Sequence, residues 1–251
     1  DPNWAHAIAA IRSGKLGKLK LVKGLCYKRR KSIGEKPITE PPAELDFDLW
    51  LGPAPEQPHH GNLVHYNWHW FWDFGNGDIG NQGVHQMDVG HWGLPEGSKF
   101  PRTAISLGGR FGYTDQGQTP NTQLAIFDYD GVPFIFEVRG LDTERQKGVG
   151  IGNIFVLEHG EIREGRFYPN DAKKNEKGEE QHIPLPEVEY KLGTPDNFRN
   201  FIDVVRSRKL EDLNAPMEAG YYPSAICELA NASYRVGQKV PFSRKAGFAG
   251  N

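Results

Sequence analysis

The sequence predicts an α+β fold: an open, mostly antiparallel β-sheet with helices packed on one face. Two observations support this prediction. Several segments between residues 103 and 167 alternate apolar and polar residues and follow one another through short links, which is typical of half-buried antiparallel strands. Helical periodicity is concentrated near the two ends of the chain and in one central segment. Because there is no internal repeat and no clean domain break, we expect residues 1–251 to form a single domain.

The first 60 residues predict one helix, one strand and one long loop. Residues 1–14 combine an acidic cap, an early proline, apolar residues at helical spacing and a terminal glycine, so we expect a helix there. A long strand is expected at 16–30. Residues 33–60 are rich in proline and acidic residues and predict a loop, with one compact piece at 47–53.

The remaining elements follow from the same patterns. Asp130-Gly131 separates two alternating runs and suits a tight primed turn, so it predicts a hairpin. The aromatic segment 65–74 predicts strand or loop, and the glycines at 75–80 predict turns. Strands are expected at 103–113, 122–129, 132–139, 153–157 and 161–167, helices at 81–94, 195–209 and 219–236, and a polar loop at 170–180.

Composition excludes several classes of protein. Hydrophobic residues make up 37% and charged residues 25% of the 251 residues, which is typical of a globular chain. The net charge is −2 and acidic and basic residues are interleaved, with no basic cluster that would bind phosphates, so nucleic acid is not an expected partner. No apolar run approaches the roughly 20 residues of a membrane span, so we expect a soluble protein. Cys26 and Cys227 have no metal or redox spacing, and we expect two buried thiols.

Aromatic residues point to a carbohydrate ligand. Four of the six tryptophans lie between Trp68 and Trp92, among histidine, asparagine and aspartate. A sugar ring offers an apolar face that stacks on an aromatic ring and a rim of hydroxyls that polar groups bind. This segment is therefore the predicted sugar site.

The segment 81–94 places chemistry on one helix face. Residues Asn81, His85, Asp88 and Trp92 are spaced by three or four, so they should share one side of a helix. An imidazole can exchange a proton with a sugar hydroxyl near neutral pH, so His85 is the predicted catalytic residue. Metal binding is a minority hypothesis for this region, and its candidate ligands are His65, His69 and His85.

These motifs resemble those of a known family. Asn81-Gln82-Gly83-Val84-His85 resembles the D-x-G-x-H segment of the Gfo/Idh/MocA oxidoreductases. The segments 50–55, 66–73, 136–140 and 231–237 resemble a bacterial subgroup of that family, and the first helix resembles the one that begins its C-terminal domain. The resemblance implies a substrate-binding domain, of bacterial cytoplasm or periplasm, that forms homo-oligomers through its open sheet.

The resemblance also assigns roles to residues. In the family, the histidine that His85 matches assists proton transfer from the oxidised hydroxyl. The aspartate that normally lies four residues before it is Asn81 here, and Asn81 can only orient His85 or bind a hydroxyl. We expect the substrate to be contacted by further aromatic and polar side chains, namely Tyr27, Arg30, Trp68, His69, Trp70, Trp72, Asp73 and Asp88.

The family's cofactor motif is missing. Its nucleotide-binding domain holds NAD(P) through G-x-G-x-x-G between a strand and a helix. The glycine clusters at 75–77 and 148–152 lack that context, and Glu35-Lys36-Pro37 lies in a proline-rich loop, unlike the family's catalytic lysine motif. We therefore expect no NAD(P) on this chain unless a separate nucleotide-binding domain supplies it, and no hydride transfer by this chain alone.

Three functions stay open from the sequence. The first is the substrate-binding half of a sugar oxidoreductase. The second is a stand-alone, NAD-independent glycoside hydrolase or lyase, with a divalent metal as an optional aid. The third is a non-catalytic module for sugar binding or oligomerisation. The expected partner is a sugar or glycoside.

Overall fold

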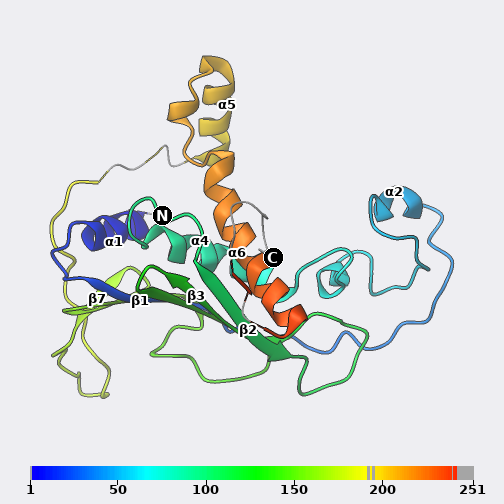
Figure 1. Ribbon diagram of the computed structural model, residues 1–251, viewed down its shortest axis with the longest axis horizontal. Helices are drawn as coiled ribbons and strands as arrows, with labels where there is room; N and C mark the ends of the chain where they lie inside the picture. Colours follow the sequence, from blue (N-terminus) through cyan, green and yellow to red (C-terminus); the bar gives the residue numbers. More distant parts are fainter. Residues whose placement is uncertain (1, 191–192, 194–195, 239, 242–251) are drawn as a thin grey trace.

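The computed structural model describes residues 2–190, 193, 196–238 and 240–241, and these form one twisted sheet with helices on one side (Figure 1). The strand order is β7-β6-β5-β1-β4-β3-β2-β8. Only β1 and β4 pair in parallel; every other described neighbour pairs in antiparallel fashion. The strands are β1 (Leu19–Cys26), β2 (Thr103–Gly109), β3 (Thr122–Tyr129), β4 (Val132–Arg139), β5 (Ile151–Leu157), β6 (Gly160–Arg163), β7 (Arg166–Pro169) and β8 (Val240–Pro241).

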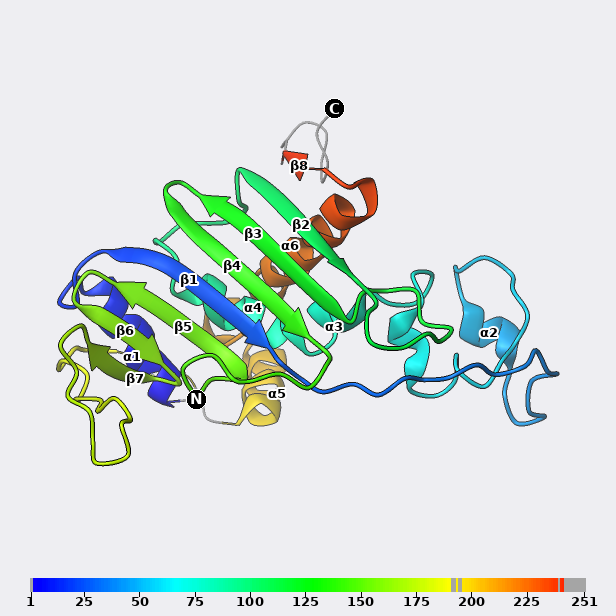
Figure 2. The same cartoon turned by 90° about the horizontal axis from the view of Figure 1, so that it is seen from below.

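Three helices cover one face of the sheet: α1 (Pro2–Arg12), α4 (Gly83–Trp92) and α6 (Met217–Val236). Seen from the opposite side, the strands β1 to β6 lie in front and these helices lie behind them (Figure 2). The remaining helices are α2 (Phe47–Leu51), α3 (Gly77–Gly80) and α5 (Asn197–Ser207), together with the short 3-10 helices η1 (Asn67–Trp70) and η2 (Leu210–Asp212). The predicted fold class is confirmed.

Strand alternation decides which side chains meet the helices. In β4, Phe134 and Phe136 are fully buried under α4, whereas Glu137 and Arg139 point to the other face. The helix comes close because its facing positions are glycines. A Cβ atom at Gly90 would overlap the ring of Phe134, so only glycine permits this approach.

The hairpin of β3 and β4 is confirmed residue by residue. Asp130 and Gly131 both have positive φ, 49° and 90°, which is the conformation of a type I′ turn. Tyr129 pairs with Val132 directly across this turn. The Asp-Gly pair thus fixes the register of the central sheet.

Other elements differ from the sequence-based expectations. The expected strand 161–167 is wrong, because a turn at Glu164 and Gly165, with φ of 50° and 73°, splits it into β6 and β7. The aromatic segment 65–74 forms no strand in the structure; it contains the 3-10 helix η1. Short helices also occur where loop or turn was expected, at α2 and α3. The expected strand at 16–30 shortens to β1, and the helix expected from Asn81 begins at Gly83.

Residues 31–76 form a lobe beyond the end of the sheet that carries the last residues of β1 and β4 (Figure 2). A separate small core holds it together, built around Leu63, Trp70 and Phe71. Asp46 caps α2 by accepting a hydrogen bond from the Leu49 amide at 3.0 Å. Elsewhere Cys26 and Cys227 are both buried and free, as expected. None of the described helices is long and apolar enough to cross a membrane.

Candidate substrate-binding site

The outward face of α4 carries His85, Asp88 and Trp92. The opposite face of this helix is buried against the sheet through Gly83, Met87 and Gly90. His85 is exposed and Trp92 is 38% exposed, so both are open to a ligand. The predicted shared face is present for these three residues. Asn81 is not part of the helix: it ends α3, and its amide donates to the Gly77 carbonyl at 2.9 Å.

Asp88 has an unusual carboxyl group for a residue near the surface. Partial burial raises its pKa to about 6, and a hydrogen bond from the Trp92 side chain and the nearby His85 imidazole oppose that rise. The carboxyl therefore titrates close to neutral pH, beside an exposed histidine. A carboxyl group with a strongly raised pKa is typical of functional sites.

Two basic side chains that follow β1 bind α3 and the turn between α3 and α4. Lys28 Nζ donates to Gln82 Oε1 at 2.9 Å. Arg30 donates to both carboxylate oxygens of Asp78, at 2.8 and 2.5 Å, and also to the Tyr66 hydroxyl at 3.0 Å. The Asp78 side chain is fully buried and that of Arg30 is 10% exposed. Arg30 was an expected substrate contact, but its guanidinium is already used to position the site.

The central aromatic residues of the lobe are buried, which corrects their expected role. Trp70 is only 2% exposed, with the Arg110 guanidinium carbon 4.7 Å and the Arg30 guanidinium carbon 5.9 Å from its ring centroid. His69 is also 2% exposed, and its Nδ1 contacts the Tyr66 carbonyl at 2.9 Å. Burial lowers the pKa of His69, so it is neutral near pH 7. Neither ring is open to a ligand; both support the lobe from inside.

Other aromatic residues of this segment are open. Trp68 is 39% exposed and Tyr66 is 62% exposed. Trp72 is half-buried, because the Arg235 guanidinium carbon lies 5.1 Å from its ring centroid. Asp73 is exposed and accepts a hydrogen bond from Gln57 Nε2 at 3.1 Å. Trp68 is therefore the open tryptophan of this segment.

Tyr27 lies on the other face of the sheet. Because side chains alternate along a strand, Cys26 points to the helices and Tyr27 points away from them. Its hydroxyl donates to Glu137 Oε2 at 2.5 Å, and the Arg139 guanidinium carbon lies 4.2 Å from its ring centroid. The structure therefore does not bring Tyr27 to His85, and the expected joint contact with substrate is wrong in its geometry.

The metal candidates are not gathered. Within the part of the chain that the structure describes, no three histidine, cysteine or acidic side chains are placed to hold a metal ion. His69 is buried, whereas His65 and His85 are exposed. The three histidines named from the sequence thus form no common donor set.

Among the described residues, no strand leads through a glycine-rich turn directly into a helix. A nucleotide cradle needs a strand, a glycine-rich turn and a helix in succession. The residues after β1 lead into the extended lobe and not into a helix. The glycines at 148–152 lie in a turn and at the start of β5, and those at 75–80 lie in and before α3.

Some residues that build the site gave only a weak signal in the sequence. Asp78 lies among the glycines that predicted turns, yet it is the buried partner of Arg30. Asn231 was part of a recognised motif without a role. Its Nδ2 donates to the Asn76 carbonyl at 2.9 Å and its Oδ1 accepts from Gln123 at 3.2 Å, which joins α6 to the segment before α3.

Comparison with known proteins agrees with this geometry. Residues 21–118 match the family model described as the oxidoreductase family, C-terminal alpha/beta domain, of the Gfo/Idh/MocA group. No curated protein matches the sequence. Among solved structures, the chain is similar to the WlbA dehydrogenase from Bordetella pertussis in complex with NADH and UDP-GlcNAcA, at 16% identity and a TM-score of 0.54.

Two further structures have the same fold. One is an NAD-binding protein from Listeria innocua, at 13% identity and a TM-score of 0.56. The other is an oxidoreductase from Agrobacterium radiobacter in complex with NAD+, L-tartaric acid and magnesium, at 14% identity and a TM-score of 0.52. The three matches cover 94–96% of this chain but only 58–62% of the solved chains. The motifs quoted from the sequence and the family match lead to one conclusion: residues 21–118 of this chain are similar to the C-terminal alpha/beta domain of the Gfo/Idh/MocA oxidoreductase family.

Proposed function

We propose that this chain is the substrate-binding half of an NAD(P)-dependent oxidoreductase that acts on a sugar or a similar polyol. The observation that carries the proposal is the outward face of α4, where His85, Asp88 and Trp92 lie within the segment that matches the family. Two solved structures of the same fold hold polyhydroxylated compounds, UDP-GlcNAcA and L-tartaric acid. The cofactor belongs to a separate nucleotide-binding domain, because the described part of this chain has no cradle for it.

Each residue on the outward face of α4 has a distinct task in the proposed site. His85 accepts the proton of the substrate hydroxyl, for which an exposed imidazole is suited near neutral pH. Asp88 lies three residues further along the helix, and its carboxylate stabilises the imidazolium that forms. Trp92 offers an apolar surface to the carbon face of the ring. Asn81 is neutral, so it binds a hydroxyl or orients His85.

Helix α5 supplies a surface against which the cofactor domain can pack. Its apolar residues recur at helical spacing and are exposed: Phe198 by 84%, Phe201 by 61%, Ile202 by 44% and Val205 by 43%. The helix projects from the helical layer, away from the sheet (Figure 1). An apolar stripe of this kind is typical of a helix that packs on another domain. We infer that the cofactor domain covers α5.

The open face of the sheet is the proposed contact between subunits. Four apolar side chains of β2 and β3 are exposed there: Ile105 by 39%, Leu107 by 66%, Leu124 by 43% and Ile126 by 40%. Leu107 pairs with Leu124, and Ile105 pairs with Ile126, so they form one patch. Burying such a patch against a second copy would remove it from water.

Calorimetric titration of the chain with sugars, inositols and sugar acids tests the proposed function. We expect at least one of these compounds to bind without any nicotinamide cofactor. The substitution His85→Ala should weaken that binding by about tenfold, which is 1.4 kcal/mol. His159→Ala is the matched control, because His159 is an exposed histidine between β5 and β6, outside the candidate site. Equal affinity of wild type and His85→Ala would remove His85 from the site.

A further inference from the structure

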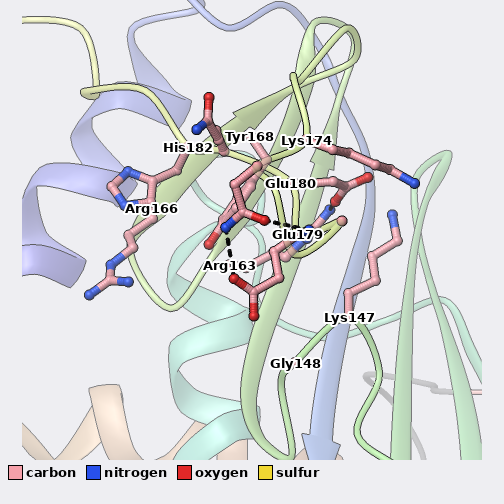
Figure 3. A pocket seen from close by; sticks show the side chains of 12 residues that line it. Lys147, Gly148, Arg163, Arg166, Tyr168, Lys174, Glu179, Glu180 and His182 are labelled. Atoms are coloured by element: carbon pink, nitrogen blue, oxygen red, sulfur yellow. Dashed lines mark hydrogen bonds and ion pairs between the residues drawn. The ribbon is translucent and has the colours of Figure 1, made fainter.

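A hollow lies at the edge of the sheet where β6 and β7 end the strand order (Figure 3). It has a volume of about 830 Å³. Three segments wall it: the turn at Lys147 and Gly148, the strands β6 and β7, and the loop 174–182. It shares no residue with the candidate substrate site and does not depend on the proposed function.

The guanidinium of Arg163 lines the hollow and is held in place by its neighbours. The Arg163 side chain is only 8% exposed, and it donates to Glu161 Oε2 at 3.0 Å and to Glu180 Oε2 at 2.5 Å. The Arg163 guanidinium carbon also lies 4.3 Å from the ring centroid of Tyr168. Strand, loop and aromatic ring therefore hold this cation in one place.

The outer wall is also ordered by its own hydrogen bonds. Asn175 Oδ1 accepts from the amides of Lys177 and Glu179, both at 2.9 Å, and its Nδ2 donates to Glu179 Oε2 at 2.8 Å. At the end of this loop, the Ile183 amide donates to the Phe167 carbonyl at 2.9 Å. The loop is thus shaped without any ligand.

Lys147 has a conformation that lysine rarely adopts. Its φ is +49° and that of Gly148 is +82°, while Gln146 and Val149 exchange backbone hydrogen bonds of 3.0 and 2.9 Å. This is a type I′ turn, whose first central position favours asparagine, aspartate or glycine. The Lys147 ammonium contacts the carboxylate of Glu161 in β6, which also pairs with Arg163. Residues with a strained backbone conformation are typical of functional sites, where the side chain is needed at that position.

The hollow has surplus positive charge. Both acids that line it are engaged, Glu180 by Arg163 and Glu179 by Asn175. Glu161, which does not line the hollow, pairs with Lys147 and Arg163. Lys174 and Arg166 also line the hollow, and neither has an ion pair within 4.0 Å among the described residues. Lys147 and Lys174 extend toward the same side in Figure 3.

We propose that this hollow binds a small anion, a carboxylate or phosphate monoester, between Lys147 and Lys174 in front of Arg163. Charged nitrogen donors at fixed positions are the partners that such anions require. The hydroxyls or ring of a larger anionic ligand would meet Tyr168, Gln181 and His182 on the remaining walls. A sugar acid and a sugar phosphate share this chemistry.

Titration calorimetry with inorganic phosphate, glucuronate and glucose 6-phosphate tests the proposal and separates these sources. We expect saturable binding of at least one probe that weakens as NaCl is raised, because salt screens exposed charges. Lys174→Ala should weaken it by about tenfold or more. Lys177→Ala is the matched control, because Lys177 lies in the same loop but does not line the hollow. An equal loss with Lys177→Ala would contradict the site.

The variant Lys147→Gly should separate stability from anion binding. Glycine relieves the left-handed conformation, so this variant should have a higher melting temperature than the wild type. It should nevertheless lose anion binding, since the ammonium is gone. A lysine kept only for folding would not separate the two readouts in this way. Unchanged anion binding in Lys147→Gly, or no saturable binding of any probe by the wild type, would overturn the proposal.

Discussion

At the scale of single residues, the candidate site depends on the environment of Asp88. Its carboxyl is half-buried beside Trp92, and the raised pKa of about 6 means that folding disfavours its charged form. In the proposed site, ionised Asp88 places a negative charge next to the exposed His85. Ionised Asp88 therefore lowers the free energy of unfolding, and a destabilising charged group of this kind is expected at a functional site.

The substitution Asp88→Asn should make this cost measurable. The folded pKa of about 6 is above the ordinary 3.8, so the wild type loses stability as the pH rises from about 4 to above 6. Asparagine carries no charge, so at pH 8 the variant should unfold with a free energy about 1–3 kcal/mol higher than the wild type. Denaturant unfolding at pH 8 and pH 5 checks this. The gain should be clearly smaller at pH 5; a gain independent of pH would show that charge burial is not its cause.

The sequence predicted part of this site for a clear reason. His85, Asp88 and Trp92 share a face because the helical period alone determines it. Trp70 and His69 were expected to contact substrate because the segment is rich in aromatic and polar residues, and composition does not tell which rings are buried in a 3-10 turn inside an irregular lobe. Whether an aromatic ring is buried or open there depends on Arg110, which lies far along the chain.

At the scale of elements, the position of α4 depends on how closely it approaches the sheet. Gly90 faces Phe134, and Gly83 faces Phe136. Both phenylalanines are completely buried, so they cannot move aside without disturbing the core. The close packing of α4 on the sheet therefore determines the positions of His85 and Asp88 relative to the strand ends.

The substitution Gly90→Ala should lower the free energy of unfolding by about 1–3 kcal/mol, because the added methyl group overpacks the Phe134 ring. Helix propensity alone would favour alanine by up to about 1 kcal/mol. The matched control is Gly220→Ala in α6, where no atom lies within 4 Å of the new Cβ. Denaturant unfolding should show a gain for Gly220→Ala and a loss for Gly90→Ala. A gain for both would mean that α4 packs less closely than described.

The elements that the sequence predicted well are those with local chemical signals. Asp130-Gly131 determines its turn by itself, so the β3–β4 hairpin was correct to the residue. The break between β6 and β7 was missed because Glu164 takes a left-handed conformation that its residue type does not favour. The helix α2 was missed because it is only five residues long and has no period to read.

At the scale of the whole molecule, the sheet divides the chain into two faces with different exposures. The helices bury one face, and the exposed apolar patch of β2 and β3 lies on the other. The candidate site on α4 lies on the helical side, which leaves the open face available for a second copy (Figure 2). Substrate binding and subunit contact would therefore not compete.

The double substitution Leu107→Lys and Leu124→Lys should abolish self-association, because it places two charges directly opposite each other in the patch. Leu49→Lys is the control, since Leu49 is also exposed, by 77%, but lies on α2 in the lobe. Sedimentation velocity should show an oligomer for wild type and Leu49→Lys, and a monomer for the double variant. A monomeric wild type would contradict the proposed contact.

In the proposed function, this chain binds the substrate and another domain holds the cofactor. The most direct measurement follows the indole N–H resonances of the tryptophans by NMR, because Trp92 lies beside His85 and Asp88 in the candidate site. A sugar or polyol that binds should shift the Trp92 resonance, which Trp92→Phe identifies, and NADH should shift none of them. The opposite result, saturable shifts with NADH and none with any sugar or polyol, would contradict the assignment of this chain as the substrate-binding half.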